Sequence, residues 1–347
     1  MSVAGMRAGR SMRDAPDALG HPSSDIRHPT SDMHPAYSVI FFTTASGAGY
    51  GLLALLGVMG PLGLLPIERW FGAAAIALSL TMVTAGLVAS MLHLGHPERA
   101  WRAVSQIRTS WLSREGLAAL LAYLPALAFA SGWVLFASAD GIFALAGYAS
   151  AILAVVTVWC TGMIYASLRP IRQWHNGLVV PVYFALALMT GALWLAALAA
   201  LFGLGARPLL ALAVAAIVIA GGVKWRYWRI IDAGLASSTP ETATGLIGGG
   251  RVRLLDPPNT AENYLQKEMG FAIARKHAAK LRRVALIVGF AAPLALALAG
   301  LAAGGTLAAI LAPLAAVSAM FGVLIERWLF FAEATHTVTL YYGAAKV

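Results

Sequence analysis

The stretch VALIVGFAAPLALALAGLAAGGTLAAILAPLAAVSAMFGVLI, residues 284–325, decides how many times this protein crosses a membrane. It contains 42 residues and no charged side chain. One helix needs roughly 20 apolar residues to cross a hydrocarbon layer about 30 Å thick, so the stretch is about twice as long as one span requires. Ala303, Gly304 and Gly305 interrupt it near the middle. The stretch therefore predicts two helices joined by a tight turn.

The rest of the sequence has the same apolar character. Of its 347 residues, 59% are hydrophobic and 12% are charged, whereas about 25% are charged in an average soluble domain. Lipid offers no partner for backbone N–H and C=O groups, so helices are the expected structure of the uncharged runs. The sequence predicts an all-α integral membrane protein, a bundle of eight transmembrane helices at 37–59, 70–92, 116–138, 143–166, 179–202, 207–224, 284–302 and 307–328.

The distribution of Lys and Arg predicts the orientation of these spans. Of the 25 Lys and Arg residues, 23 fall on the side that holds both termini, and only Arg69 and Arg207 fall on the other. Basic residues collect in cytoplasmic loops, so both termini are predicted to be cytoplasmic. We expect a flexible cytoplasmic tail at 1–34 and a membrane domain at 35–347, with a long cytoplasmic loop at 224–283. This pattern accounts for the net charge of +10 without a nucleic-acid partner.

The cysteine and histidine residues limit the cofactors that this protein can hold. A single cysteine, Cys160, cannot bind an iron–sulfur cluster, which needs several thiolates, and no metal site is predicted. All 8 histidines lie on the predicted cytoplasmic side. A haem relay across the membrane needs paired histidines within the spans, so a haem could lie only near the cytoplasmic face.

The loop between the sixth and seventh spans contains two notable segments. Its first residues, KWRYWR at 224–229, are typical of the aromatic and basic belt at a membrane interface, in contact with lipid. Residues 259–283 predict a helix with a polar cap at its start and basic residues at its end. We expect this helix to lie on the membrane or to dock a partner subunit. The candidate docking residues are Asn259, Tyr264, Arg275, Arg282 and Arg283.

Charged residues follow the last apolar run. Glu326, Arg327 and His336 form a candidate network for proton transfer or for packing, because charges inside a span usually face the bundle interior and pair there. Glu326 and Arg327 are consecutive. We therefore expect their side chains to point in different directions, each toward another partner.

The connection between the second and third spans, SMLHLGHPERAWRAVSQIRTSWLSREG at 90–116, concentrates charges in a sequence that has few. His93 follows the second span directly, Arg99 lies in the connection, and Glu115 opens the third span from the same side. A quinone carries two carbonyl oxygens that exchange protons when electrons move. A neutral imidazole can bond one oxygen and a carboxylate can pass the proton to bulk water. These residues therefore predict a quinone pocket at the cytoplasmic edge.

The motifs SMLHLGHPERAW and TSWLSREG, with HPAYSVIFFTTASGAGYG around the start of the first span, resemble the membrane anchor subunits of the dimethyl sulfoxide reductase family. The resemblance covers most of the sequence. It implies a bacterial inner-membrane protein that exchanges electrons with menaquinone or ubiquinone, carries no haem, and binds a four-cluster iron–sulfur subunit and a molybdopterin catalytic subunit. It also implies that the quinone site consists of His93, Gly95, Arg99 and Glu115.

The direction of electron flow has two interpretations. The segment RLLDPPNTAENYLQKEMGFAIARKHAAKLRR is similar to the branch that serves cytoplasmic sulfite-oxidising enzymes, which implies electron flow from sulfite into quinone. The alternative is quinol oxidation that supplies a reductase of dimethyl sulfoxide or a similar acceptor. Other classes fit less well. A secondary transporter usually has broken helices with polar groups at mid-depth. A proton-translocating subunit needs a polar path to the outer face, and a purely structural anchor would leave the quinone to bind elsewhere.

Overall fold

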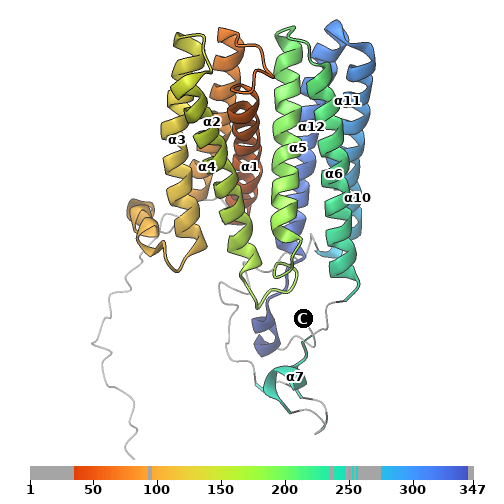
Figure 1. The fold of residues 1–347 in the computed structure, drawn as a ribbon. Coiled ribbons are helices and arrows are strands. Elements are labelled where there is room, and N and C mark those ends of the chain that lie inside the picture. Colours follow the sequence, from red (N-terminus) through yellow and green to blue (C-terminus); the bar gives the residue numbers. More distant parts are fainter. Residues whose placement is uncertain are drawn as a thin grey trace, which may run out of the picture. The chain divides into compact units, whose positions relative to one another are not determined.

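The computed structural model describes residues 35–92, 96–234, 238–246, 250, 252–253, 255–256 and 275–342. All of them belong to one compact unit, Met33–Val347. The regular elements of the described residues are helices, and eight of these helices are long and apolar enough to cross a membrane (Figure 1). The prediction of an all-α protein with eight spans is therefore confirmed for this part of the chain.

The observed helices follow the predicted order. The spanning elements are α1 (Pro35–Met59), α2 (Arg69–Met91), α3 (Trp111–Leu135), α4 (Gly141–Ala166), α5 (Val179–Leu201), α6 (Arg207–Asp232), α10 (Ala278–Leu286) continued by η2 (Ile287–Ala291) and α11 (Ala292–Ala303), and α12 (Gly305–Ala332). Three short helices lie between or after them: η1 (Pro97–Gln106), α7 (Pro240–Thr244) and η3 (Thr337–Tyr342).

The 42-residue apolar stretch folds as two antiparallel helices, as predicted. Gly304 has φ +67° and Gly305 has φ +51°, a backbone region that side chains with a Cβ rarely adopt. The first of the two spans also contains a π-helical segment, η2. Pro293 follows it, and because its nitrogen carries no hydrogen it cannot donate to a carbonyl of the preceding turn. A π turn accommodates that missing bond without breaking the span.

Two helices extend beyond their predicted limits. The sixth span was expected to end at 224, but α6 continues to Asp232. Lys224, Tyr227 and Trp228 are buried, so this part of the expected interface belt belongs to the helix bundle. Trp225 is exposed and lies 5.4 Å from the Arg229 guanidinium, as residues of such a belt would. The apolar pattern missed the extension because it treated every charged residue as a loop residue.

The third span begins at Trp111 rather than at 116. Ser110 caps it, and its hydroxyl oxygen accepts a hydrogen bond from the backbone N–H of Ser113 at 3.4 Å. Glu115 consequently lies inside the helix, in its second turn, and not in the connection ahead of it.

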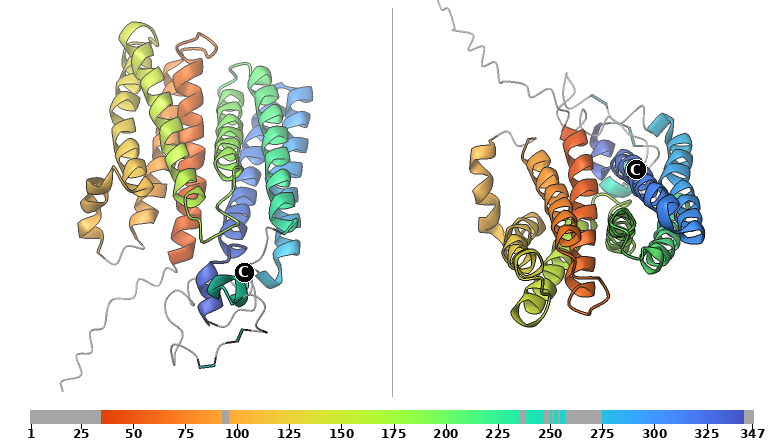
Figure 2. Two further views of the ribbon diagram at one scale, coloured as in Figure 1. Left: turned by 60° about the horizontal axis from the view of Figure 1, so that its bottom comes forward. Right: turned by 90° about the horizontal axis from the view of Figure 1, so that it is seen from above.

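The centre of the bundle is formed by α1 and α5. Helix α1 packs against α2, α4, α5 and α12, and Figure 2 shows these neighbours around it. Gly51 of α1 and Gly191 of α5 allow the two backbones to touch, since a Cβ on Gly51 would collide with the carbonyl of Ala187. Small residues play this role in membrane bundles, where close van der Waals packing holds helices together.

The alternating helix directions bring distant segments to one end of the bundle. Helices α1, α3, α5 and α10 start there, and α2, α4, α6 and α12 end there (the lower end in Figure 1). We call it the basic end, because the connections that hold most of the Lys and Arg residues join the helices there. The sequence predicts that this end faces the cytoplasm.

Candidate functional site

Four ionisable side chains are buried inside the spans. Glu115, Lys224, Glu326 and Arg327 are each at most 3% exposed. Glu115 lies near the start of α3, Lys224 near the end of α6, and the other two near the end of α12, so all four are close to the basic end. Charged groups inside a membrane are costly and usually mark a functional site or a paired structural network. The four fall into two groups, which are bridged by a small polar cavity.

The first group is Glu115 with Thr161 of α4. The Thr161 hydroxyl donates to Glu115 Oε1 and also lies 3.0 Å from the Thr157 carbonyl oxygen. A hydroxyl has one hydrogen to donate and can also accept. When Glu115 is ionised, Thr161 donates to it; when Glu115 is protonated, it can donate to Thr161 while Thr161 turns to the carbonyl. The pair can therefore satisfy both protonation states of the carboxyl group.

The other residues predicted for the quinone pocket do not contact Glu115 in the part of the chain that the structure describes. His93 and Gly95 lie outside the described residues. Arg99 is exposed on η1, and its Nε lies 3.8 Å from Glu98 Oε1. The connection itself is fastened to α3 by Arg114, whose guanidinium donates to the Ile107 and Arg108 carbonyls at 2.8 Å. Arg99 is therefore available to a ligand or a partner at the surface.

The second group is the ion cluster, which we define as Lys224, Glu326 and Arg327. Arg327 donates to both oxygens of Glu326, from Nε at 2.5 Å and from Nη2 at 2.8 Å, and Lys224 Nζ pairs with the same carboxylate. The expectation that Glu326 and Arg327 point apart toward separate partners is wrong. Their Cβ atoms do diverge on the helix, but both side chains are long enough to fold back and pair where no water competes. The cluster carries two positive charges and one negative charge.

Aromatic faces surround the two cations of the cluster. Lys224 Nζ lies 4.1 Å from the ring centre of Tyr227 and 4.9 Å from that of Trp228. The Arg327 guanidinium lies 4.3 Å from Tyr183 and 4.8 Å from Phe330. Ring faces attract cations, and the attraction is stronger where water is excluded. These rings help to offset the positive charge that the single carboxylate leaves unbalanced.

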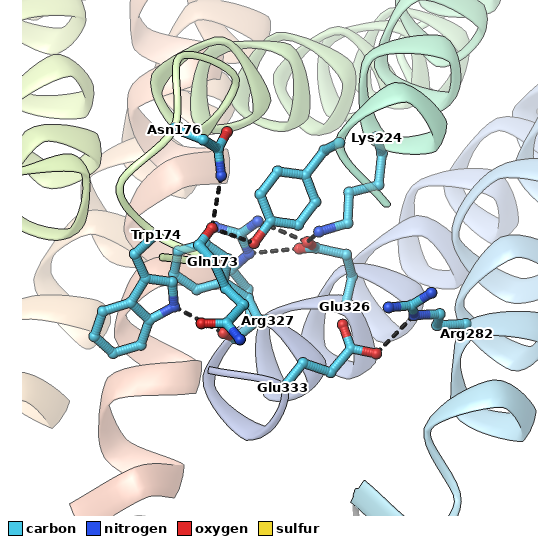
Figure 3. A network of polar contacts seen from close by, with 10 residues as sticks. Gln173, Trp174, Asn176, Lys224, Arg282, Glu326, Arg327 and Glu333 are labelled. Carbon is cyan, nitrogen blue, oxygen red and sulfur yellow. Dashed lines mark hydrogen bonds and ion pairs between the residues drawn. The ribbon is translucent and has the colours of Figure 1, made fainter. Parts of the chain in front are cut away.

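The connection between α4 and α5 encloses the cluster on the side of the basic end (Figure 3). The carbonyl oxygen of Gln173 accepts bonds from Tyr227 at 3.0 Å and from Asn176 Nδ2 at 2.7 Å. Trp174 Nε1 donates to the Phe330 carbonyl at 2.9 Å. These bonds join the connection to α6 and α12, so the ion cluster is part of a packed network and is shielded from water.

His336 does not extend this network through the contacts of the described residues. It lies beyond the end of α12, where its Nδ1 accepts a bond from the Val338 N–H at 2.9 Å. Its backbone forms an isolated bridge with Ile171 in the α4–α5 connection. The expected helical spacing between Glu326 and His336 fails because α12 ends at Ala332.

The predicted docking residues have different surroundings. Asn259 and Tyr264 lie outside the described residues. Arg275 is half-buried and donates to the carbonyls of Ala332 and Ala334 at 2.7 and 2.9 Å, and burial lowers its pKa. It therefore fastens the turn after α12 to the rest of the protein.

Arg282 and Arg283 differ in the same way. Arg282 bridges Asp232 of α6 and Glu333 after α12 at 2.7 and 2.6 Å. Burial raises the pKa of Glu333, and the Arg282 guanidinium opposes that shift. Arg283 is exposed, with its Nε 3.4 Å from the Ala279 carbonyl. Of the three arginines, only Arg283 presents its charge to the surroundings.

A small polar cavity separates the two groups. Residues of α1, α4, α5 and α12 line it, among them Tyr50, Thr161, Tyr183 and Arg327. Its volume is about 20 Å³, which is room for one water molecule. Within the described structure, Tyr50 Oη, Tyr183 Oη and Arg327 Nη1 are buried without a hydrogen-bond partner. The cavity therefore links Thr161, which bonds Glu115, to the Arg327 side of the ion cluster.

Sequence analysis missed several members of this arrangement. Lys224 was interpreted as an interface residue, although a lone Lys directly after an apolar run is also compatible with a helix that continues. Tyr50, Thr161 and Tyr183 carry no signal in a single sequence, because hydroxyl groups are common in apolar spans. In the described residues no three or more His, Cys, Asp or Glu side chains are grouped closely enough to hold a metal ion.

Known proteins are similar to this one over most of its length. The model of the family described as DMSO reductase anchor subunit (DmsC) matches residues 31–343. The third-lettered (C) subunit of the sulfite dehydrogenase of Allochromatium vinosum is 35% identical over 333 residues, which cover 89% of this chain and 99% of that protein. Two anaerobic dimethyl sulfoxide reductase chains of Escherichia coli match shorter parts. The one named YnfH is 29% identical and the other is 30% identical, each over 40% of this chain and 49% of the relative.

Proposed function

Because the chain belongs to the DMSO reductase anchor subunit (DmsC) family, we propose that it is the quinone-reactive membrane subunit of a molybdopterin and iron–sulfur oxidoreductase that oxidises sulfite. Electrons from sulfite would pass through a catalytic subunit and a four-cluster iron–sulfur subunit to a quinone held by this protein. The quinone takes up two electrons and two protons and leaves as quinol. This protein supplies the membrane anchor, the quinone site and the proton-exchanging groups.

The buried Glu115–Thr161 pair is the observation that carries the proposal. Proton transfer to a quinone oxygen needs a group that can be charged or neutral without an unpaired bond in either state. Glu115 and Thr161 satisfy this condition by reversing their hydrogen bond. A carboxyl group that served packing alone would gain nothing from a partner able to accept as well as donate.

The remaining parts of the site are proposed from the sequence. His93 and Gly95 follow α2 at the basic end, and Arg99 is exposed close by in the same connection. His93 would bond the second quinone oxygen and exchange its proton. We propose that the basic end faces the cytoplasm of a bacterium and that the partner subunits dock there. Asn259, Tyr264 and Arg283 are the proposed docking residues.

The extent of the similarity favours sulfite as the source of electrons. The sulfite dehydrogenase subunit from Allochromatium matches along nearly its whole length, whereas the two dimethyl sulfoxide reductase proteins match over about half of theirs. Quinol oxidation that supplies a dimethyl sulfoxide reductase is the second candidate. Either direction would use the same quinone site.

The test is to purify the complex by a tag on this protein, identify the co-purifying subunits, and measure electron transfer from sulfite to decylubiquinone. In Glu115→Gln, we expect quinone turnover to fall by about 100-fold, the lower end of the range for loss of a positioned acid or base. Transfer from sulfite to a soluble acceptor, which bypasses this subunit, should be unchanged. The matched control is Glu98→Gln, which alters an exposed carboxylate on η1.

Two results would contradict the proposal. A complex that reduces dimethyl sulfoxide with quinol, but does not oxidise sulfite, would establish the second candidate. A Glu115→Gln complex with the quinone turnover and pH–rate profile of the unaltered complex would remove the proposed role of the carboxyl group.

A further inference from the structure

An apolar groove opens between α1, α4 and α5. It is lined by residues such as Ala54, Leu55, Val58, Val155 and Leu188, and its volume is about 330 Å³. That volume lies within the usual range of small-ligand pockets, roughly 300–1,000 Å³. Val58, Val155 and Leu188 are exposed, so the groove is open on the side where lipid would lie.

The inner end of this groove meets the polar cavity. Tyr50, Val158 and Ala187 line both spaces. Tyr50 is 3% exposed, and its hydroxyl has no hydrogen-bond partner among the described residues. Its neighbour Thr157 does not serve as a donor to it, because that hydroxyl donates to the Leu153 carbonyl at 2.8 Å. A buried donor without a partner thus stands at the end of an otherwise apolar groove.

We propose that this groove between α1, α4 and α5 binds the quinone from the lipid side, with the isoprenoid tail along its aliphatic wall and the Tyr50 hydroxyl donating to a carbonyl oxygen of the head. The inference rests on the proposed function and adds an access route and a binding residue to it. Val158 and Ala187, which line both spaces, would flank the ring. The cavity beyond Tyr50 holds one water molecule, which joins Tyr50 to Thr161.

The direction of the Tyr50 side chain supports this arrangement. Side chains on a helix lean toward its N-terminus, and α1 starts at the basic end. The Tyr50 hydroxyl therefore leans toward the level of Thr161 and Glu115. The head of a quinone bonded to Tyr50 would be close to the carboxyl group that exchanges its proton, with its tail directed away from the basic end.

The depth of the groove distinguishes a quinone from a phospholipid. The backbone of Tyr50 lies fifteen residues after the start of α1, about 22 Å along the helix at 1.5 Å per residue. A phospholipid head group is charged and stays at the interface, because a charge at that depth is costly. A quinone head is uncharged and has oxygen acceptors, so it matches an apolar groove that ends at a hydroxyl donor.

The experiment uses the complete complex and two probes, decylubiquinone and an analogue that has the same ring without a tail. Tyr50→Phe removes the donor, and we expect the KM for both probes to rise about tenfold, which equals about 1.4 kcal/mol. The melting temperature should not fall, because the hydroxyl that is removed has no protein partner to lose. A merely structural role of Tyr50 would lower the melting temperature and leave KM unchanged, which would overturn the proposal.

A second variant tests the tail. Ala54→Phe narrows the groove, and we expect it to raise the KM for decylubiquinone at least fivefold while leaving the KM for the tail-free analogue unchanged. Ala77→Phe is the matched control, since Ala77 is an exposed residue of α2 outside the groove. An unchanged KM for decylubiquinone in Ala54→Phe, or an equal rise for both probes, would refute the tail site.

The outcomes separate this inference from the proposed function. An unaltered complex that transfers no electrons from sulfite or to dimethyl sulfoxide through quinone would contradict the proposed function. An active complex whose Tyr50→Phe and Ala54→Phe variants keep both KM values would contradict the groove alone and leave the function standing.

Discussion

The ion cluster gives the sharpest prediction for stability. Glu326 is the carboxylate to which both Lys224 and Arg327 bind, and all three side chains are at most 1% exposed. Glu326→Gln would leave two cations close together, without their counter-charge and away from water. Removing one partner of a buried pair costs about 3–5 kcal/mol. At roughly 2–4 °C per kcal/mol for a protein of this size, the melting temperature should fall by on the order of 10 °C.

Lys224→Met should behave differently, because it leaves Glu326 and Arg327 as a neutral, doubly bonded pair. Its cost should be about 1.5 kcal/mol, the lower end for a hydrogen bond to a charged group. The same change should raise the melting temperature when Glu326→Gln is already present, since it then removes one of two repelling cations. The sign of the Lys224→Met effect therefore depends on residue 326.

Cys160 provides the assay. It is the only cysteine of the sequence, and it is buried in α4. A dye that becomes fluorescent on reaction with a thiol reports unfolding of the purified protein in detergent as Cys160 becomes accessible. The reasoning is refuted if Glu326→Gln is no more destabilising than Lys224→Met, or if Lys224→Met lowers the melting temperature equally in both backgrounds.

Three further predictions concern other parts of the molecule. Gly304→Ala should cost about 1–3 kcal/mol in the same dye assay, because φ +67° with ψ −169° is strained for alanine; Gly300→Ala, at a helical position with ordinary contacts, is the control and should be neutral or better. Arg282→Met should lower the melting temperature at pH 8 and much less at pH 5. The reason is that the raised pKa of Glu333 makes the folded protein bind a proton more tightly than the unfolded protein, so its stability rises as the pH falls, and loss of Arg282 enlarges this effect; an equal loss at both pH values would contradict it. Thr161→Val should slow quinone turnover by about tenfold without lowering KM, since Glu115 loses the partner that serves both of its protonation states, and an unchanged rate would argue against the switching hydrogen bond.

Much of the fold could be predicted from the sequence because a membrane restricts the possible structures. Uncharged runs of sufficient length gave eight spans, and two adjacent glycines gave the turn at Gly304. The limits of α3 and α6 were wrong because the charge pattern cannot distinguish a loop residue from a charged residue at the end of a helix. Burial of Lys224 requires α12 beside it, and a pattern within one helix contains no information about its neighbour.

The candidate site was predicted only in part, for the same reason. Glu115 stood out because it is a carboxyl group at the start of an apolar run, but its partner Thr161 lies 46 positions later and resembles other hydroxyl residues of the spans. The geometry of Glu326 and Arg327 was predicted wrongly, since the directions of two neighbouring Cβ atoms do not determine where two long side chains end.

The sequence by itself determined that the protein crosses a membrane eight times and that its Lys and Arg residues collect at one end, because length and charge act locally along each span. Only the tertiary structure decided which helices are neighbours. It brought α4 beside α3 and α12 beside α6, which turned isolated side chains into the Glu115–Thr161 pair and the ion cluster. In a membrane such pairing is a matter of close packing between helices, and the geometry of that packing depends on every helix at once.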